Sequence, residues 1–168
     1  LLSTGKKWRA RSNGSSCAIL ARRGINKTMI EIRKVKTPRG RRISLFLQSE
    51  EQHVIHAEDL LLLPALIDPH VHFRTPGAEH KETWQTAARA AIAGGVTTVI
   101  DMPNNTPSCC TEERFNEKKL LIDSQLQAAD IPLRYFLYLG ADGRHLDEIE
   151  NLADRIAGLK IYMGSSTG

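Results

Sequence analysis

The stretch that decides the fold is Leu61-Leu-Leu-Pro-Ala-Leu-Ile-Asp-Pro-His-Val-His-Phe-Arg74, in which an apolar run leads into two histidines. Residues two apart on a β-strand point to the same face. The pattern therefore predicts that His70 and His72 project side by side from the end of a buried strand, as a pair suited to a metal ion. On the same face, we expect Asp68 to orient a ligand and Arg74 to grip a carboxylate with two hydrogen bonds.

Strand and helix patterns alternate from this point to the end of the chain. The expected strands are residues 61–72, 96–102, 133–140 and 159–163, and the expected helices are 82–93, 111–129 and 146–157. This alternation predicts an α/β fold with a parallel sheet, for which a (β/α)₈ barrel is the obvious candidate. A complete barrel needs eight strands and about 250 residues. We therefore expect residues 61–168 to be the first half of such a barrel, with strands 1–4, in the N-terminal part of a longer protein.

Two segments precede the expected barrel. Residues 29–60 contain short apolar runs around a Pro38-Arg39-Gly40 turn signal, and they predict a small β-rich segment. His53 and His56 in this segment are three residues apart, so they face opposite ways on a strand and are expected at the surface. Met29 reads like a natural start, and residues 1–28 like a basic extension outside the fold.

Charge is divided unevenly along the chain. Residues 1–42 carry 13 Lys and Arg against one acid, whereas the other residues carry 10 against 18, which gives the net charge of +4. An organelle transit peptide and a nucleic-acid-binding tail are the alternatives for residues 1–28. We expect no nucleic-acid partner, because the basic segment comes with neither a platform of aromatic residues on which bases could stack nor a folded nucleic-acid-binding module.

Chain length, hydropathy and cysteine count further limit the class of protein. The 168 residues suffice for a core, and no apolar run is long enough to cross a membrane. Three cysteines argue against a disulfide framework and fit a reducing compartment. We expect a cytoplasmic protein with no membrane partner.

Polar residues also follow two later strands. Asn104 in Met102-Pro103-Asn104 has an amide that can both donate and accept, so it suits a carboxylate or a ring amide, although a simple turn residue is the alternative. Lys160 lies in an apolar run, where burial favours the neutral amine. A neutral amine can react with carbon dioxide to form a carbamate. The alternative for Lys160 is a stem that lines the core and a head that reaches solvent.

The string Asp68-Pro-His-Val-His-Phe-Arg74 resembles the metal-binding signature of the cyclic amidohydrolases, and its arginine makes it most similar to the dihydroorotases. The Met-Pro-Asn string and the loop at residues 75–82 resemble elements of the same family. The resemblance implies a metal-dependent TIM barrel that interconverts N-carbamoyl-L-aspartate and dihydroorotate in pyrimidine biosynthesis. Ala65, where the family usually has Gly, and Asn105, where it more often has Thr, depart from its pattern.

The same resemblance implies roles for five residues. His70, His72 and Lys160 would bind two zinc ions, with Lys160 carboxylated and bridging them. Arg74 and Asn104 would bind the substrate. The family also needs two further histidines and an aspartate general base, and no residue of this chain can be assigned to them. We therefore expect no catalytic base in this chain and no activity from it alone.

Two alternatives stay open. A hydantoinase- or allantoinase-like enzyme would share the His-x-His strand, but its substrates lack the ring carboxylate that Arg74 would bind. A non-catalytic dihydroorotase-like scaffold would instead pair with another pyrimidine enzyme. The expected partners are a small-molecule substrate and either a second copy of the chain or another enzyme of that pathway.

Overall fold

The structure, a computed structural model, describes residues 28–164 as two compact units that are divided after Pro64. Residues 1–27 and 165–168 lie outside the described part. The basic extension predicted for residues 1–28 therefore falls almost wholly outside it, and its assignment stays a prediction.

The first unit is a three-stranded sheet. It contains β1 (Thr28–Lys36), β2 (Arg42–Ser49) and β3 (His53–His56), in the order β2-β1-β3. β2 runs antiparallel to β1 through a turn in which Gly40 has a φ of +79°, and β3 runs parallel to β1. His53 and His56 are both exposed, in agreement with the surface position expected from their spacing.

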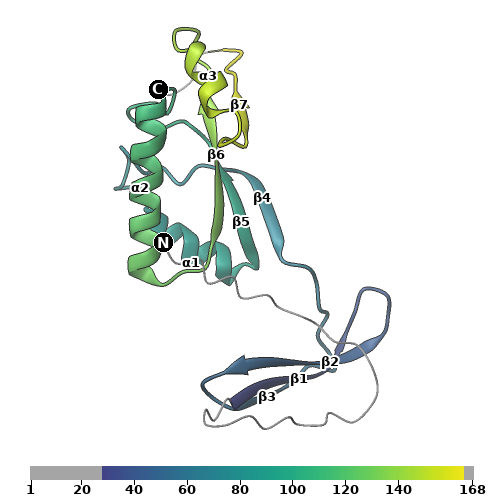
Figure 1. Ribbon diagram of the computed structural model, residues 1–168. Helices are drawn as coiled ribbons and strands as arrows, with labels where there is room; N and C mark the ends of the chain where they lie inside the picture. Colours follow the sequence, from purple (N-terminus) through teal and green to yellow (C-terminus); the bar gives the residue numbers. More distant parts are fainter. Residues whose placement is uncertain (1–27, 165–168) are drawn as a thin grey trace. The chain divides into compact units, whose positions relative to one another are not determined.

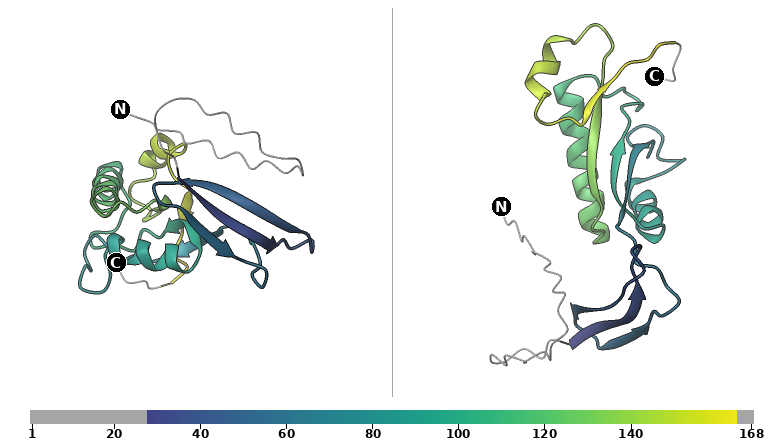
Figure 2. Two further views of the ribbon diagram at one scale, coloured as in Figure 1. Left: turned by 90° about the horizontal axis from the view of Figure 1, so that it is seen from below. Right: turned by 90° about the vertical axis from the view of Figure 1, so that its right-hand side faces the viewer.

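The second unit is a parallel sheet with helical crossovers (Figure 1). Its strands are β4 (Leu66–Val71), β5 (Val96–Asp101), β6 (Arg134–Gly140) and β7 (Gly158–Lys160), in the order β4-β5-β6-β7. The crossovers contain α1 (Trp84–Ala93), α2 (Glu112–Ala129) and α3 (Asp147–Leu152). Each strand pairs in parallel with the next strand of the sequence, which confirms the predicted strand–helix alternation of a half barrel. Figure 2 shows the same succession from two further sides.

Local sequence signals explain where the two long helices begin and end. Thr83 caps α1 in a reciprocal capping box with Thr86, and Gly95, with a φ of +83°, follows its last turn. Thr111 caps α2 by accepting the Arg114 N–H at 3.4 Å, and Asp130 ends it in the left-handed conformation. None of the described helices is both long and apolar enough to span a membrane.

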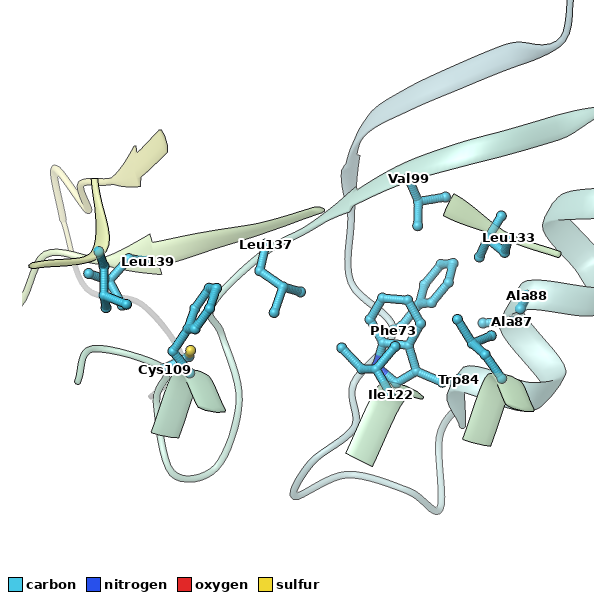
Figure 3. Close-up of a cluster of buried hydrophobic side chains, with 13 residues drawn as sticks. Phe73, Trp84, Ala87, Ala88, Val99, Cys109, Ile122, Leu133, Leu137 and Leu139 are labelled. Carbon is cyan, nitrogen blue, oxygen red and sulfur yellow. The ribbon is translucent and has the colours of Figure 1, made fainter. Parts of the chain in front are cut away.

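The core of the second unit lies between its helices and one face of its sheet (Figure 3). Trp84 of α1 is fully buried there, in an edge contact with Phe73 at 4.8 Å between ring centroids. Its indole N–H donates to the Thr75 carbonyl at 3.3 Å. The chain that follows β4 is thus anchored to the core just beyond the two histidines.

Four expectations about these elements are wrong in detail, and the first is the strand at 159–163, which ends at Lys160 in the structure. The strand at 61–72 begins only at Leu66, because the Leu62 N–H instead donates to the Lys36 carbonyl beside β1. The strand is not buried: Leu66 and Ile67 are 54% and 65% exposed, since β4 pairs only with β5 among the described strands. The helix at 146–157 ends at Leu152, whose carbonyl accepts two N–H groups in a tight turn.

Candidate metal and substrate site

The predicted site residues lie at or just after strand ends, all at the same end of the second unit's sheet. His70 is in β4 and His72 follows it, Asn104 follows β5, and Lys160 is the last residue of β7. Because β4 to β7 are parallel and adjacent in order, their carboxyl ends lie at the same end of the sheet. In (β/α)₈ barrels, the active site lies at this carboxyl-terminal end of the strands.

The two histidines lie close enough to share a metal ion. Their ring centroids are 5.3 Å apart, and the rings are inclined at 46°. Two imidazoles on one tetrahedral zinc ion, each with a Zn–N bond of about 2.0–2.1 Å, would have ring centres about 5 Å apart. The spacing of His70 and His72 therefore fits a shared ion.

Electrostatics keep His72 in the form that binds metals. Partial burial is the main cause that lowers the pKa of His72, and the positive charges of Arg74 and Lys160 lower it further, while Asp101 opposes them. A metal ligand must be the neutral imidazole, so the direction of this shift favours binding.

Asp68 differs from what the strand pattern predicted, whereas the face to which Arg74 points stays a prediction. The Asp68 carboxylate accepts the backbone N–H of His70 at 3.0 Å, so it orients the main chain and not a histidine ring. β4 ends at Val71, and Arg74 has a φ of +67°, so the alternation of a strand no longer governs its direction. The Arg74 residue is half-buried and lines the same cavity as His72.

Lys160 has the predicted position but not the predicted burial. Its side chain is half-buried at the end of β7, and its ammonium lies 5.7 Å from the ring centroid of Tyr162. Its position at the carboxyl end of β7, at the same end of the sheet as His70 and His72, is what supports a role at the site.

Asn104 lies in a loop that is hydrogen-bonded to the loop after β4. The residue is half-buried, and its neighbour Asn105 is buried. The Asn105 side-chain amide donates to the Pro76 carbonyl at 3.2 Å, which links this loop to the loop after β4. Asn105, which departs from the family pattern, thus has a structural contact of its own.

A buried ion pair beneath these loops was not predicted from the sequence. Lys118 of α2 and Asp101 at the end of β5 are each 1% exposed, and they meet at 2.6 Å. The signal was present, because Lys118 occupies one position of the buried stripe that Phe115, Ile122 and Leu126 otherwise form. Leu120 of the same helix is, by contrast, 71% exposed.

A cavity of about 560 Å³ opens beside β4 and is lined by part of the candidate site. His72 and Arg74 contribute to its wall together with Ala87, Ala90 and Ala91 of α1. His70, Asn104 and Lys160 do not line it, so the cavity includes only part of the candidate site.

The set of metal ligands among the described residues is incomplete. Within residues 28–164, no three His, Cys, Asp or Glu side chains come together as a metal site. His70, His72 and a carboxylated Lys160 would supply three donors.

Comparison with known proteins defines the class. The sequence pattern of the Amidohydrolase family matches residues 61–165. The chain belongs to this family. In fold, it resembles an L-hydantoinase (dihydropyrimidinase) from Arthrobacter aurescens, with a TM-score of 0.65 and 22% identity over 82% of this chain and 33% of that one.

Within the family, similar curated proteins include several dihydroorotases. The chain is 41% identical to that of Methanosarcina acetivorans over 73% of this chain, and 34% identical to that of Methanosphaera stadtmanae over 69%; it covers 26% of each. It is also 37% identical to the multifunctional protein CAD of Squalus acanthias over 64% of this chain, which is 4% of that protein. The chain thus spans about a quarter of the length of these dihydroorotases.

Proposed function

We propose that this chain supplies the first half of a dihydroorotase active site. The reaction would interconvert N-carbamoyl-L-aspartate and dihydroorotate, a step of de novo pyrimidine biosynthesis. The observation that carries the proposal is the gathering of His70, His72, Arg74 and Asn104 at the ends of two adjacent parallel strands. Similarity to curated dihydroorotases over more than two thirds of the chain supports it.

His70, His72 and Lys160 would hold the metal. The neutral imidazole favoured at His72 suits this role, and the two ring centres are spaced for a shared ion. Lys160, as a carbamate, would bridge two zinc ions from β7. When bound, the ions lower the pKa of water and polarise the ring amide carbonyl.

Arg74 and Asn104 would orient the substrate. The guanidinium of Arg74 offers a planar pair of donors that matches a carboxylate, and the amide of Asn104 can donate to the same group. Dihydroorotate carries a ring carboxylate that hydantoin lacks. The two side chains would therefore select substrate and hold the ring amide towards the metal ligands.

Residues 28–164 contain no side chain that we can assign as the general base. We therefore expect purified residues 1–168 to show no dihydroorotase turnover, and an assay of dihydroorotate ring opening by this chain checks that expectation. Zinc-dependent turnover by residues 1–168 would contradict it.

The test of the function uses the protein in its full natural length. We expect turnover of dihydroorotate, loss of that turnover on treatment with a chelator, and its return with zinc. Hydantoin serves as the matched substrate without the carboxylate. Turnover of hydantoin but not of dihydroorotate would replace the proposal with a hydantoinase-like enzyme. Zinc binding with no turnover of either would favour a non-catalytic scaffold.

Association with another pyrimidine enzyme belongs to the same proposal. One similar sequence is part of a protein named as multifunctional, which supports such an arrangement. A homodimer and a cytoplasmic location stay predictions.

A further inference from the structure

We propose that Lys118 is a positioning residue of the candidate site, whose ammonium fixes the loop after β4 relative to the loop after β5. It would thereby set the distance between Arg74, on the first loop, and Asn104, on the second. The inference rests on the proposed function for the part that concerns substrate.

The ammonium of Lys118 has three acceptors for its three protons. It donates to Asp101 Oδ2 at 2.6 Å, to the Met102 carbonyl at 3.0 Å and to Asn105 Oδ1 at 2.7 Å. An ammonium carries three donors and no acceptor, so its hydrogen-bonding capacity is filled. A fully satisfied buried group holds its partners in one arrangement.

Asp101 carries the constraint to the histidine strand. Its second oxygen, Oδ1, accepts the backbone N–H of Phe73 at 2.8 Å. Phe73 lies between His72 and Arg74, so the carboxylate fixes the main chain that bears both of them. The Met102 N–H also donates to the Val71 carbonyl at 2.9 Å, which ties the two strand ends together directly.

Asn105 carries the constraint to the other end of the first loop. Its side-chain amide donates to the Pro76 carbonyl at 3.2 Å, and its oxygen accepts from Lys118. The two loops also touch at Gly77, where an added Cβ would lie 2.1 Å from the Thr106 carbonyl oxygen. The loops are therefore joined on both sides of Arg74.

Stability alone does not account for an ion pair at this place. Replacing a buried ion pair with apolar residues is often neutral or stabilising, and α2 already fills the neighbouring core positions with Phe115 and Ile122. Among the described residues, the buried polar side chains are Thr75, Asp101, Asn105 and Lys118. All four lie in the two loops, at a strand end beside them, or directly beneath them.

The test replaces Lys118 with methionine in the protein of full natural length. Lys119→Met is the matched control, because Lys119 is adjacent and exposed, and its ammonium contacts Asp123 and Tyr135 at the surface, away from the two loops. The double variant Asp101→Asn/Lys118→Met avoids an uncompensated buried carboxylate and keeps an acceptor for the Phe73 N–H. If the single variant does not fold, the double variant still tests the clamp, by which we mean the hydrogen bonds of Lys118 that hold the two loops together.

The kinetic readout is the division of the effect between KM and kcat. We expect Lys118→Met and the double variant to raise the KM for dihydroorotate about tenfold to a hundredfold, because a misplacement of about 1 Å costs up to about 10²-fold. A merely structural role would reduce the fraction of active protein and leave KM unchanged. An unchanged KM in both variants would overturn the assignment.

Amide hydrogen exchange tests the clamp without activity. We expect the Phe73 and Asn105 amides to exchange at least about tenfold faster in Lys118→Met and the double variant than in Lys119→Met, while amides of β6 stay protected. Exchange equal to that of the control would overturn the clamp. If the unaltered protein does not turn over dihydroorotate, the proposed function fails, and this comparison still decides the role of Lys118.

Discussion

At the level of single residues, His72 combines the features that a metal ligand needs. Its ring is partly buried, lies 5.3 Å from that of His70 between centroids, and is near the positive charges of Arg74 and Lys160. Each of these surroundings disfavours the imidazolium. The site therefore keeps His72 neutral at a lower pH than a free imidazole.

A pH titration checks this electrostatic account. We expect His72 in the metal-free protein to titrate below the ordinary histidine pKa, since burial and then Arg74 lower it. The native state binds this proton less readily than the unfolded state, so the contribution of His72 to stability is present above the ordinary pKa and is lost as the pH falls through the lowered one. NMR titration of the histidine ring protons gives the midpoint.

Arg74→Met serves as the comparison for that titration. Removing its charge should move the His72 midpoint part of the way back towards the ordinary value, while burial keeps it below. A midpoint at or above the ordinary histidine pKa in the unaltered protein would contradict the account.

Arg74→Lys tests the carboxylate grip. Lysine keeps the charge but loses the planar pair of donors, and one charge-assisted hydrogen bond contributes about 1.5–3 kcal/mol. We expect the KM for dihydroorotate in the full-length protein to rise roughly tenfold to a hundredfold, because each 1.4 kcal/mol is a factor of ten. Steady-state kinetics measure it, and a KM within about twofold of the original would argue against the role.

At the level of elements, two loops meet where the strands end. Gly77, in the loop after β4, has a φ of +96° and lies against the backbone of Thr106 in the loop after β5. A side chain there meets both backbone strain and a clash. Gly143 has a φ of +76° with nothing within 4 Å of an added Cβ, so it has the strain alone.

The pair of substitutions Gly77→Ala and Gly143→Ala separates these two effects. The left-handed conformation costs an alanine about 1–2 kcal/mol, and overpacking adds about 1–3 kcal/mol. We expect Gly77→Ala to lower the free energy of unfolding by about 2–5 kcal/mol and Gly143→Ala by about 1–2 kcal/mol. Urea unfolding measures both, and equal losses would show that the loops do not press together at Gly77.

Sequence patterns predicted the elements better than the contacts between them. The caps at Thr111 and the stop at Gly95 are local, so the bounds of α1 and α2 could be placed closely. The start of β4 could not, because Leu62 pairs instead with Lys36 of the first unit. Strand alternation is not a sound basis for the direction of Arg74, because the chain leaves the strand conformation before it.

The ion pair of Asp101 and Lys118 shows the same limit. A lysine in a charged helix is usually solvated, and only its place in the stripe of Phe115 and Ile122 marks it as buried. Its partner lies on another element, so the pairing needs the tertiary structure. The histidine pair, by contrast, lies within three residues and was found directly.

At the level of the whole molecule, the second unit carries the candidate site and the family match. Its four parallel strands bring His70, His72, Asn104 and Lys160 to the same end of the sheet. These residues are up to 90 positions apart in sequence. The first unit contributes no residue to this set.

The most direct test is a crystal structure of the full-length protein grown with zinc, with anomalous diffraction recorded above and below the zinc absorption edge. The account predicts zinc peaks within bonding distance of the His70 and His72 nitrogens, and electron density for a carboxyl group extending from Lys160 Nζ towards them. Zinc bound elsewhere, with His70 and His72 free of metal, would contradict the account.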